Sequence, residues 1–203
     1  SRNEMVMVSG IGCSSRISGY MDFHTLHTIH GRALAFATGV KLSKPELNVI
    51  VPMGDGDALS IGGNHFIHAA RRNIAITAIV MNNRIYGMTG GQVAATTPHQ
   101  AKTTTTPVGN PEQPFNLPLM AWASGATFVA RWTMLHTREL TDCIQTALLK
   151  NGFSFIEVLA PCPTNYGRRN REKAMETLKL YQEKAIIRNN ADPTELDIDF
   201  QKE

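Results

Sequence analysis

The sequence predicts an α/β protein in which a mostly parallel β-sheet is flanked by helices. Short apolar or β-branched runs alternate with longer segments that tolerate a helical period, which is the order expected of strand–helix–strand units. The composition, with 42% apolar and 18% charged residues, is that of an ordinary soluble globular protein. The 203 residues are enough for one well-buried core.

The predicted elements follow one another along the chain. Apolar or β-branched runs predict strands at residues 5–9, 47–52, 75–82, 127–132 and 153–159. The segments between them predict helices at residues 31–42, 63–72, 117–124 and 137–150. The second helix follows an apolar strand through a Gly-rich turn, and the fourth has Thr137 as its candidate N-cap and Gly152 just past its end.

Residues 83–114 interrupt this alternation with several glycines, four prolines and a run of four threonines. Long irregular loops inside compact domains are usually functional, so we expect this one to serve a site. We divide the chain into one domain, residues 1–170, and a charged peripheral tail, residues 171–203, that is helical to about residue 187.

Charge and cysteine usage exclude several classes of protein. The formal charge of +3 does not suggest nucleic acid, and the basic cluster at residues 168–173 is either a solvated helix start or a contact to a phosphate or partner. Three widely spaced cysteines argue against a disulfide scaffold and for a reducing compartment. No apolar stretch approaches the roughly 18 residues of a membrane span, and the first ten residues lack a signal-peptide pattern. We therefore expect a cytoplasmic protein without a membrane segment.

The clearest chemistry lies where two predicted strands end. One strand runs into Gly54, Asp55, Gly56 and Asp57, and the next along the chain ends at Asn83. Because the carboxyl ends of neighbouring parallel strands lie side by side, Asp55 and Asn83 are expected to converge. A carboxylate, an amide oxygen and a nearby backbone carbonyl would supply half the octahedral shell of Mg²⁺, and cofactor phosphates would supply most of the rest. On these four residues alone, a plain turn is the favoured interpretation, and a Ca²⁺ loop is disfavoured because residues 58–63 offer no acidic ligands.

The Gly-Asp-Gly at residues 54–56, followed after somewhat under thirty residues by Asn-Asn, resembles the thiamine diphosphate motif. The resemblance implies a thiamine diphosphate-binding fold for residues 1–170. Asp55 and Asn83 would bind Mg²⁺ through their side chains, and Ile85 through its backbone carbonyl. The diphosphate would lie against Gly54, Gly56 and Asp57.

Four further stretches resemble the β subunits of 2-oxoacid:ferredoxin oxidoreductases, and the similarity covers about residues 5–170. They are GIGCSSR at 10–16, HTIHGRA at 27–33, YGMTGGQ at 86–92 and APCPT at 160–164. This resemblance implies coenzyme A-dependent oxidative decarboxylation of a 2-oxoacid, with electrons passed through an iron–sulfur cluster to ferredoxin. It also implies an α subunit that completes the active site, so the isolated chain should be inactive. Residues 162–170 are most similar to the 2-oxoglutarate-specific branch.

By the same resemblance, Cys13 and Cys162 help to ligate a four-iron, four-sulfur cluster. The other two ligands of the family come from an N-terminal Cys-x-x-Cys, and no such pair precedes Cys13. We expect either a missing N-terminal segment, which we favour, or a natural variant with an incomplete cluster. Read from its position alone, Cys13 is a small buried hydrophobe, and Cys143, inside a predicted helix, is a core residue.

The resemblance also suggests four residues around the substrate. His30 would lie near the phosphate end of the cofactor, Arg16 would bind the substrate carboxylate, Met88 would line the substrate pocket, and Gly90 would shape a loop over the cofactor. The alternatives are a solvent-facing Arg16 and ordinary surface histidines at His24, His27 and His30. Metal binding by this histidine row is disfavoured because no further ligand class is evident.

Two rival functions remain open at this point. One is a subunit of a non-oxidative thiamine-dependent decarboxylase, which would share the Gly-Asp-Gly and Asn-Asn pair but need neither Cys13 nor Cys162. The other is a catalytically silent scaffold subunit.

Overall fold

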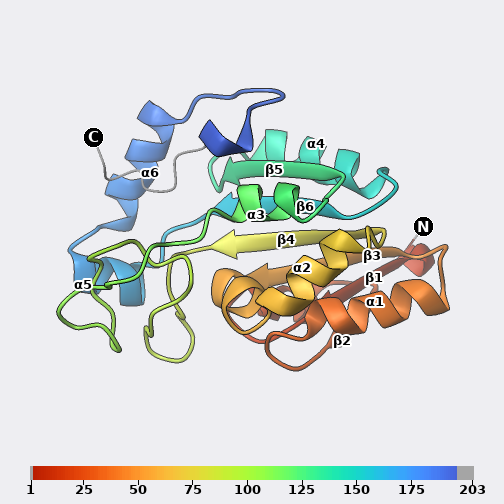
Figure 1. Ribbon diagram of the computed structural model, residues 1–203, viewed down its shortest axis with the longest axis horizontal. Helices are drawn as coiled ribbons and strands as arrows, with labels where there is room; N and C mark the ends of the chain where they lie inside the picture. Colours follow the sequence, from red (N-terminus) through yellow and green to blue (C-terminus); the bar gives the residue numbers. More distant parts are fainter. Residues whose placement is uncertain (1, 196–203) are drawn as a thin grey trace.

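The computed structural model describes residues 2–195 and contains a six-stranded sheet, every pair of which is parallel (Figure 1). The strand order is β2-β1-β3-β4-β6-β5. The strands are β1 (Met5–Ser9), β2 (His24–His27), β3 (Asn48–Gly54), β4 (Ile76–Asn82), β5 (Phe128–Thr133) and β6 (Ser154–Leu159). The predicted fold class and all five predicted strands are confirmed. The edge strand β2 was not predicted because its four residues are all exposed and form no apolar run.

Four helices of the predicted set are present, with two more in the tail. They are α1 (Ala33–Ser43), α2 (Gly63–Arg71), α3 (Leu117–Ala123), α4 (Thr137–Leu148), α5 (Arg168–Asn170) and α6 (Ala174–Lys184). The short turns are 3-10 segments η1 (Arg2–Glu4), η2 (Ser14–Tyr20) and η5 (Pro193–Glu195), and π-type segments η3 (Gly56–Ser60) and η4 (Pro163–Gly167). The expected cap of α4 is wrong: Thr137 is its first helical residue, and His136 occupies the N-cap without a side-chain hydrogen bond.

One face of the sheet is covered by α1, α2 and α3, which pack on alternate residues of the strands (Figure 1). On β4 these residues are Ile76, Ala78 and Val80. Phe66 of α2 meets Phe153 and Phe155 edge-on, with ring centroids 5.7 and 5.3 Å apart. This face holds the largest apolar cluster among the described residues and therefore most of the burial that stabilises the fold.

The opposite face is covered over β4, β6 and β5 by α4. Cys143 and Ala147 of α4 pack on Ile156 and Val158, with Met81 of β4 beside them. The two faces thus take alternate residues of β4, as the period of a strand requires. The interpretation of Cys143 as a core residue is confirmed.

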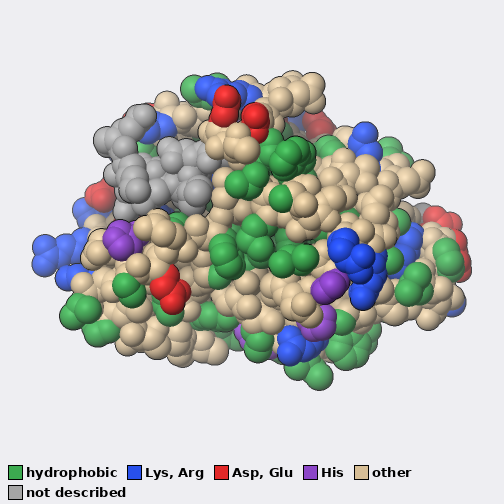
Figure 2. Space-filling model, in the orientation of Figure 1, with side chains coloured by type: hydrophobic (Ala, Val, Ile, Leu, Met, Phe, Trp, Pro, Cys, Tyr) green, Lys and Arg blue, Asp and Glu red, His purple; other side chains and the backbone are tan. Residues whose placement is uncertain are grey.

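The tail helix α6 packs part of its surface against the rest of the chain. Thr177 and Tyr181 of α6 are buried, although α6 ends at Lys184 rather than near residue 187. Arg168, Arg169 and Arg171 are exposed, and Figure 2 shows basic side chains gathered at the end of the molecule where Figure 1 places α5. Within residues 2–195, no helix combines the length and apolar character needed to cross a membrane.

Candidate functional site

A cavity of about 260 Å³ opens where β1, β3 and β4 reach their carboxyl ends. The paired residues Gly54 and Met81 bring the ends of β3 and β4 together, so the segments that follow both strands meet here. Ligands in open parallel sheets bind at this edge. The lining residues are Ile11, Gly12, Cys13, Ser14, His30, Gly54, Asp55, Gly56, Asp57, Asn83, Ile85, Tyr86, Gly87, Met88 and Thr89.

Asp55 is one of two buried carboxylates that line the cavity, the other being Asp57, and each has 2% of its surface exposed. Asp55 directly follows β3 and is the N-cap residue of η3. Burial raises its pKa from 3.8 to about 6, although hydrogen bonds from the Thr96 hydroxyl and from the backbone N–H groups of Asp55, Gly56 and Asn83 oppose this shift. Removal from water disfavours the charged form of the carboxylate, and a cation bound beside Asp55 would stabilise that form.

Asn83 and Ile85 face the same cavity, as the sequence predicted for Asp55 and Asn83. The side-chain oxygen of Asn83 accepts a hydrogen bond of 3.3 Å from the backbone N–H of Ile85, which folds the chain back after β4. The neighbouring Asn82 points away, and its amide donates to the buried Glu157 at 2.7 Å. Of the two asparagines of the motif, Asn83 therefore lines the cavity and Asn82 contacts Glu157 of β6.

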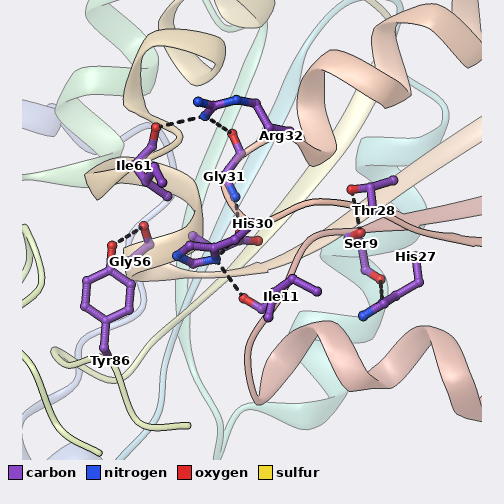
Figure 3. Close-up of polar contacts among 11 residues, drawn as sticks. Ser9, Ile11, His27, Thr28, His30, Gly31, Arg32, Gly56, Ile61 and Tyr86 are labelled. Atoms are coloured by element: carbon purple, nitrogen blue, oxygen red, sulfur yellow. Dashed lines mark hydrogen bonds and ion pairs between the residues drawn. The ribbon is translucent and has the colours of Figure 1, made fainter. Parts of the chain in front are cut away.

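His30 and Asp57 join the loop after β2 to η3. The Nδ1 atom of His30 lies 2.8 Å from Asp57 Oδ1 and 3.1 Å from the carbonyl oxygen of Ile11, the second contact being drawn in Figure 3. The backbone N–H of Gly31 donates to the same carboxylate oxygen at 2.6 Å. Burial raises the pKa of Asp57, against the opposing effects of Gly31 and His30. Asp57 lines the cavity, but one of its oxygens is engaged within the protein.

Gly56 is constrained by the ring of Tyr86. The Tyr86 hydroxyl donates to the carbonyl of Gly56 at 3.0 Å, and a Cβ atom on Gly56 would lie 2.4 Å from the ring (Figure 3). The sequence suggested that Gly56 lets the backbone approach a phosphate; the structure adds this steric reason. The cavity is lined by the first residues of η3, whereas the start of α2 at Gly63 is absent from its lining.

Cys13 and Cys162 converge although they are far apart in the sequence. A Cβ atom built on Gly87 would lie 3.5 Å from the sulfur of Cys162 and 3.7 Å from that of Cys13. Cys162 is buried, whereas Cys13 is exposed, contrary to the position-based expectation of a buried hydrophobe. Both thiols thus lie against the loop that follows Asn83.

Of Met88, Arg16 and Gly90, which the resemblance places around the substrate, one residue lines the cavity. Met88 lines the cavity and is half exposed. Arg16 is exposed on η2, and Gly90 has a positive φ of 115° in the following loop; neither belongs to the cavity lining. The sequence did not reveal Thr96 or Tyr86, since both belong to irregular backbone whose path no local pattern encodes.

The three candidate Mg²⁺ ligands in this cavity include one acidic side chain. Among residues 2–195, no three or more His, Cys, Asp or Glu side chains are grouped to hold a metal ion. The set at Asp55, Asn83 and Ile85 contains one carboxylate, one amide and one backbone carbonyl, which are hard oxygen donors of the kind Mg²⁺ takes. The histidine row is dispersed, because His24 and His27 lie on β2 and His30 in the loop beyond it.

Comparison with known proteins gives consistent matches. The family model described as thiamine pyrophosphate enzyme, C-terminal TPP binding domain, matches residues 10–158. The chain is 54% identical to the 2-oxoglutarate synthase subunit KorB of Archaeoglobus fulgidus over 100% of its own length and 76% of that protein. It is 47% identical to the 2-oxoglutarate oxidoreductase subunit KorB of Mycobacterium tuberculosis, over 80% of this chain and 43% of that protein.

A solved structure resembles the whole fold. It is 2-oxoglutarate:ferredoxin oxidoreductase from Magnetococcus marinus, with 2-oxoglutarate, coenzyme A and succinyl-CoA bound. The TM-score is 0.86 at 36% sequence identity, over 98% of this chain and 65% of that one.

Proposed function

Because the chain belongs to the thiamine pyrophosphate enzymes, and among them to the β subunits of 2-oxoacid:ferredoxin oxidoreductases, we propose that it is the thiamine diphosphate-binding subunit of a 2-oxoglutarate:ferredoxin oxidoreductase. The observation that carries this proposal is the meeting of Asp55, Asn83 and Ile85 at one cavity. The names of the relatives favour an oxidoreductase over a non-oxidative decarboxylase or a scaffold subunit.

The site fits Mg²⁺ and a diphosphate. Asp55 is a buried carboxylate without a described cationic partner, and burial raises its pKa by more than its hydrogen bonds lower it. A divalent ion would do so, with Asn83 and the carbonyl of Ile85 completing the protein share of the shell. Gly54 and Gly56 leave the cavity wall without side chains, so phosphate oxygens could approach the backbone.

The protein contributes placement and shielding to the chemistry. When bound, thiamine diphosphate would supply the nucleophilic carbon and the electron sink for loss of CO₂ from a 2-oxoacid. Asp57, held by His30 and Gly31, would keep the first turn of η3 in place beneath the diphosphate. Met88 would give the substrate an apolar wall, and the loop that contains Gly90 would limit access of water. Arg16, exposed on η2 outside the cavity lining, would bind a substrate carboxylate.

We propose Cys13 and Cys162 as iron–sulfur ligands, since both sulfurs flank Gly87 beside the cavity. A four-iron, four-sulfur cluster takes four thiolates, and the described residues place only two here. The fit is therefore partial, since Cys13 and Cys162 would supply half of the ligands.

The partners follow from the same proposal. They are an α subunit that completes the active site, 2-oxoglutarate and coenzyme A as substrates, and ferredoxin as electron acceptor. A cytoplasmic location would suit free thiols at Cys13, Cys143 and Cys162.

Calorimetry of thiamine diphosphate binding, with and without Mg²⁺, tests the cofactor site on the chain purified with its α partner. Asp55→Ala should abolish Mg²⁺-dependent binding, whereas Asp142→Ala, at an exposed position of α4, should bind as wild type does. Equal binding by wild type and Asp55→Ala would refute the site. Reduction of ferredoxin on addition of 2-oxoglutarate and coenzyme A then distinguishes the oxidoreductase from a lyase.

A further inference from the structure

We propose that Arg84 is a positioning residue, which holds residues 83–85 in their metal-binding conformation through an ion pair with Glu172 of the C-terminal tail. This inference rests on the proposed function. It assigns a role in cofactor binding to the tail, which lies outside the segment matched by the thiamine pyrophosphate family model.

The backbone at Arg84 is strained. Its φ is 64°, in the left-handed region that glycine adopts freely and other residues rarely do. A non-glycine residue persists there only when its surroundings impose the conformation, and such residues cluster at functional sites. Two hydrogen bonds of the Arg84 backbone support this conformation: its N–H donates to Asn82 Oδ1 at 3.0 Å, and its carbonyl accepts from the Thr97 hydroxyl at 2.6 Å.

The residues on either side of Arg84, Asn83 and Ile85, contribute to the cavity, although Arg84 does not. The Arg84 side chain instead contacts Glu172 of the tail, and 14% of the side-chain surface is exposed. The orientation of Asn83 and Ile85, two of the proposed ligands, therefore depends on the position in which the Arg84 side chain is held.

Glu172 of the tail and Tyr166 of η4 hold the guanidinium. Its Nη2 atom lies 2.6 Å from Glu172 Oε1, and its carbon lies 4.2 Å from the ring centroid of Tyr166. A desolvated guanidinium stacked on an aromatic face and paired with a carboxylate is well placed to resist rotation. Burial lowers the pKa of Arg84, but its interactions with Tyr166, Glu172 and Tyr181 outweigh this effect, so the charge is retained.

Glu172 is itself fixed by its surroundings. Its Oε1 atom accepts a hydrogen bond of 2.5 Å from the Thr177 hydroxyl, and its N–H donates to the carbonyl of Gly167 at 2.9 Å. Asn170 ties the same segment to the long loop, since its amide donates to the carbonyl of Lys102 at 3.0 Å and its oxygen accepts from the Lys102 N–H at 2.7 Å. The tail therefore provides a rigid anchor for the residues after β4.

The test compares Glu172→Gln with Glu176→Gln, both on the chain purified with its α partner. Glu172→Gln removes the charge that holds Arg84 but retains the shape of the side chain. Glu176 pairs with Lys173 on the exposed side of the same segment at 3.0 Å, which makes it a matched control. Arg84→Gln, which removes the same ion pair from its other side, is the second variant if Glu172→Gln does not fold.

Two measurements are made on each variant. Calorimetry should show that Glu172→Gln weakens Mg²⁺-dependent thiamine diphosphate binding about 10- to 100-fold, the usual cost of removing a residue that orients a metal ligand. Hydrogen exchange without cofactor should show faster exchange of the amides at residues 83–86 in Glu172→Gln. Glu176→Gln should match wild type in both.

The outcomes separate this inference from the proposed function. Normal binding by wild type together with equal binding by a folded Glu172→Gln or Arg84→Gln would overturn the role of Arg84 and leave the cofactor site standing. Unchanged hydrogen exchange at residues 83–86 would also overturn it. Absence of binding in wild type would overturn the proposed function, and this inference with it.

Discussion

Thr96 donates a hydrogen bond to the buried carboxylate of Asp55, a residue 41 positions earlier in the chain. The loop that contains Thr96 thus folds back over the end of β3. Other loop contacts fix this path, since the backbone N–H of Ala95 donates to the Ser60 hydroxyl at 2.9 Å. The irregular segment after β4 is therefore part of the candidate metal site rather than a connection around it.

Thr96→Val should weaken Mg²⁺-dependent cofactor binding at neutral pH. The hydrogen bond from Thr96 is the largest of the effects that lower the pKa of Asp55, so its loss raises that pKa further and disfavours the carboxylate that binds the metal. Hydrogen bonds to charged groups are worth roughly 1.5–3 kcal/mol, so the affinity should fall about tenfold or more. Calorimetry checks this, and Thr96→Ser should restore binding; wild-type affinity in the valine variant would contradict it.

Asp55→Asn should make the metal-free chain more stable, and more so above pH 6. The pKa of Asp55 is about 6 in the folded chain and near 3.8 when unfolded, so between these values the folded state binds more protons. Stability therefore falls as pH rises through this window, by about 3 kcal/mol in all, and stays lower above it. Urea denaturation in EDTA at pH 4.5 and 7.5 measures the effect. An equal difference between variant and wild type at both pH values would show that Asp55 is not responsible.

The parts of the site that follow strands could be predicted from the sequence, because the topology of a parallel sheet determines where strand ends meet. Asp55 and Asn83 needed only the order of β3 and β4 to be placed together. Cys13 and Cys162 were associated by motif resemblance, and the structure brings both sulfurs beside Gly87.

The parts that depend on loop paths could not be predicted. Thr96 and Tyr86 reach the site through backbone without a period, and the local sequence contains no signal for their contacts. The edge strand β2 was missed because edge residues need not be apolar. Arg84 and Glu172 pair across 88 positions, and their ion pair depends on a fold-back of the tail that charge pattern alone does not specify.

Gly56→Ala should destabilise the chain and impair cofactor binding. The new methyl group would lie 2.4 Å from the Tyr86 ring, and overpacking of this kind typically costs about 1–3 kcal/mol. Gly39→Ala is the matched control, since nothing lies within 4 Å of a Cβ atom at that helical position and alanine there should stabilise by about 0.5–1 kcal/mol. Thermal denaturation of both variants makes the comparison. Tyr86→Leu combined with Gly56→Ala should recover part of the loss if the ring is the cause.

The three thiols should react with a disulfide reagent at different rates in iron-free protein. Cys13 is exposed, whereas Cys143 and Cys162 are buried, so Cys13 should account for the fast phase. Burial also raises the pKa of Cys143, which lowers the fraction of reactive thiolate there. In stopped-flow measurements, the Cys13→Ser variant should lack the fast phase. A fast phase that persists in this variant would show that another thiol lies at the surface.

Asn82→Ala and Asn83→Ala should have different effects, although the two residues are adjacent. Asn82 donates to Glu157, which is fully buried and also bound by Arg131 at 2.5 Å, so its loss leaves a buried carboxylate oxygen without its amide donor. That change should cost about 1–3 kcal/mol of unfolding free energy. Asn83 lines the cavity and is only partly buried, so Asn83→Ala should chiefly remove Mg²⁺-dependent binding. Urea denaturation and calorimetry on both variants test the contrast, and a greater loss of stability in Asn83→Ala would reverse the assignment of the two roles.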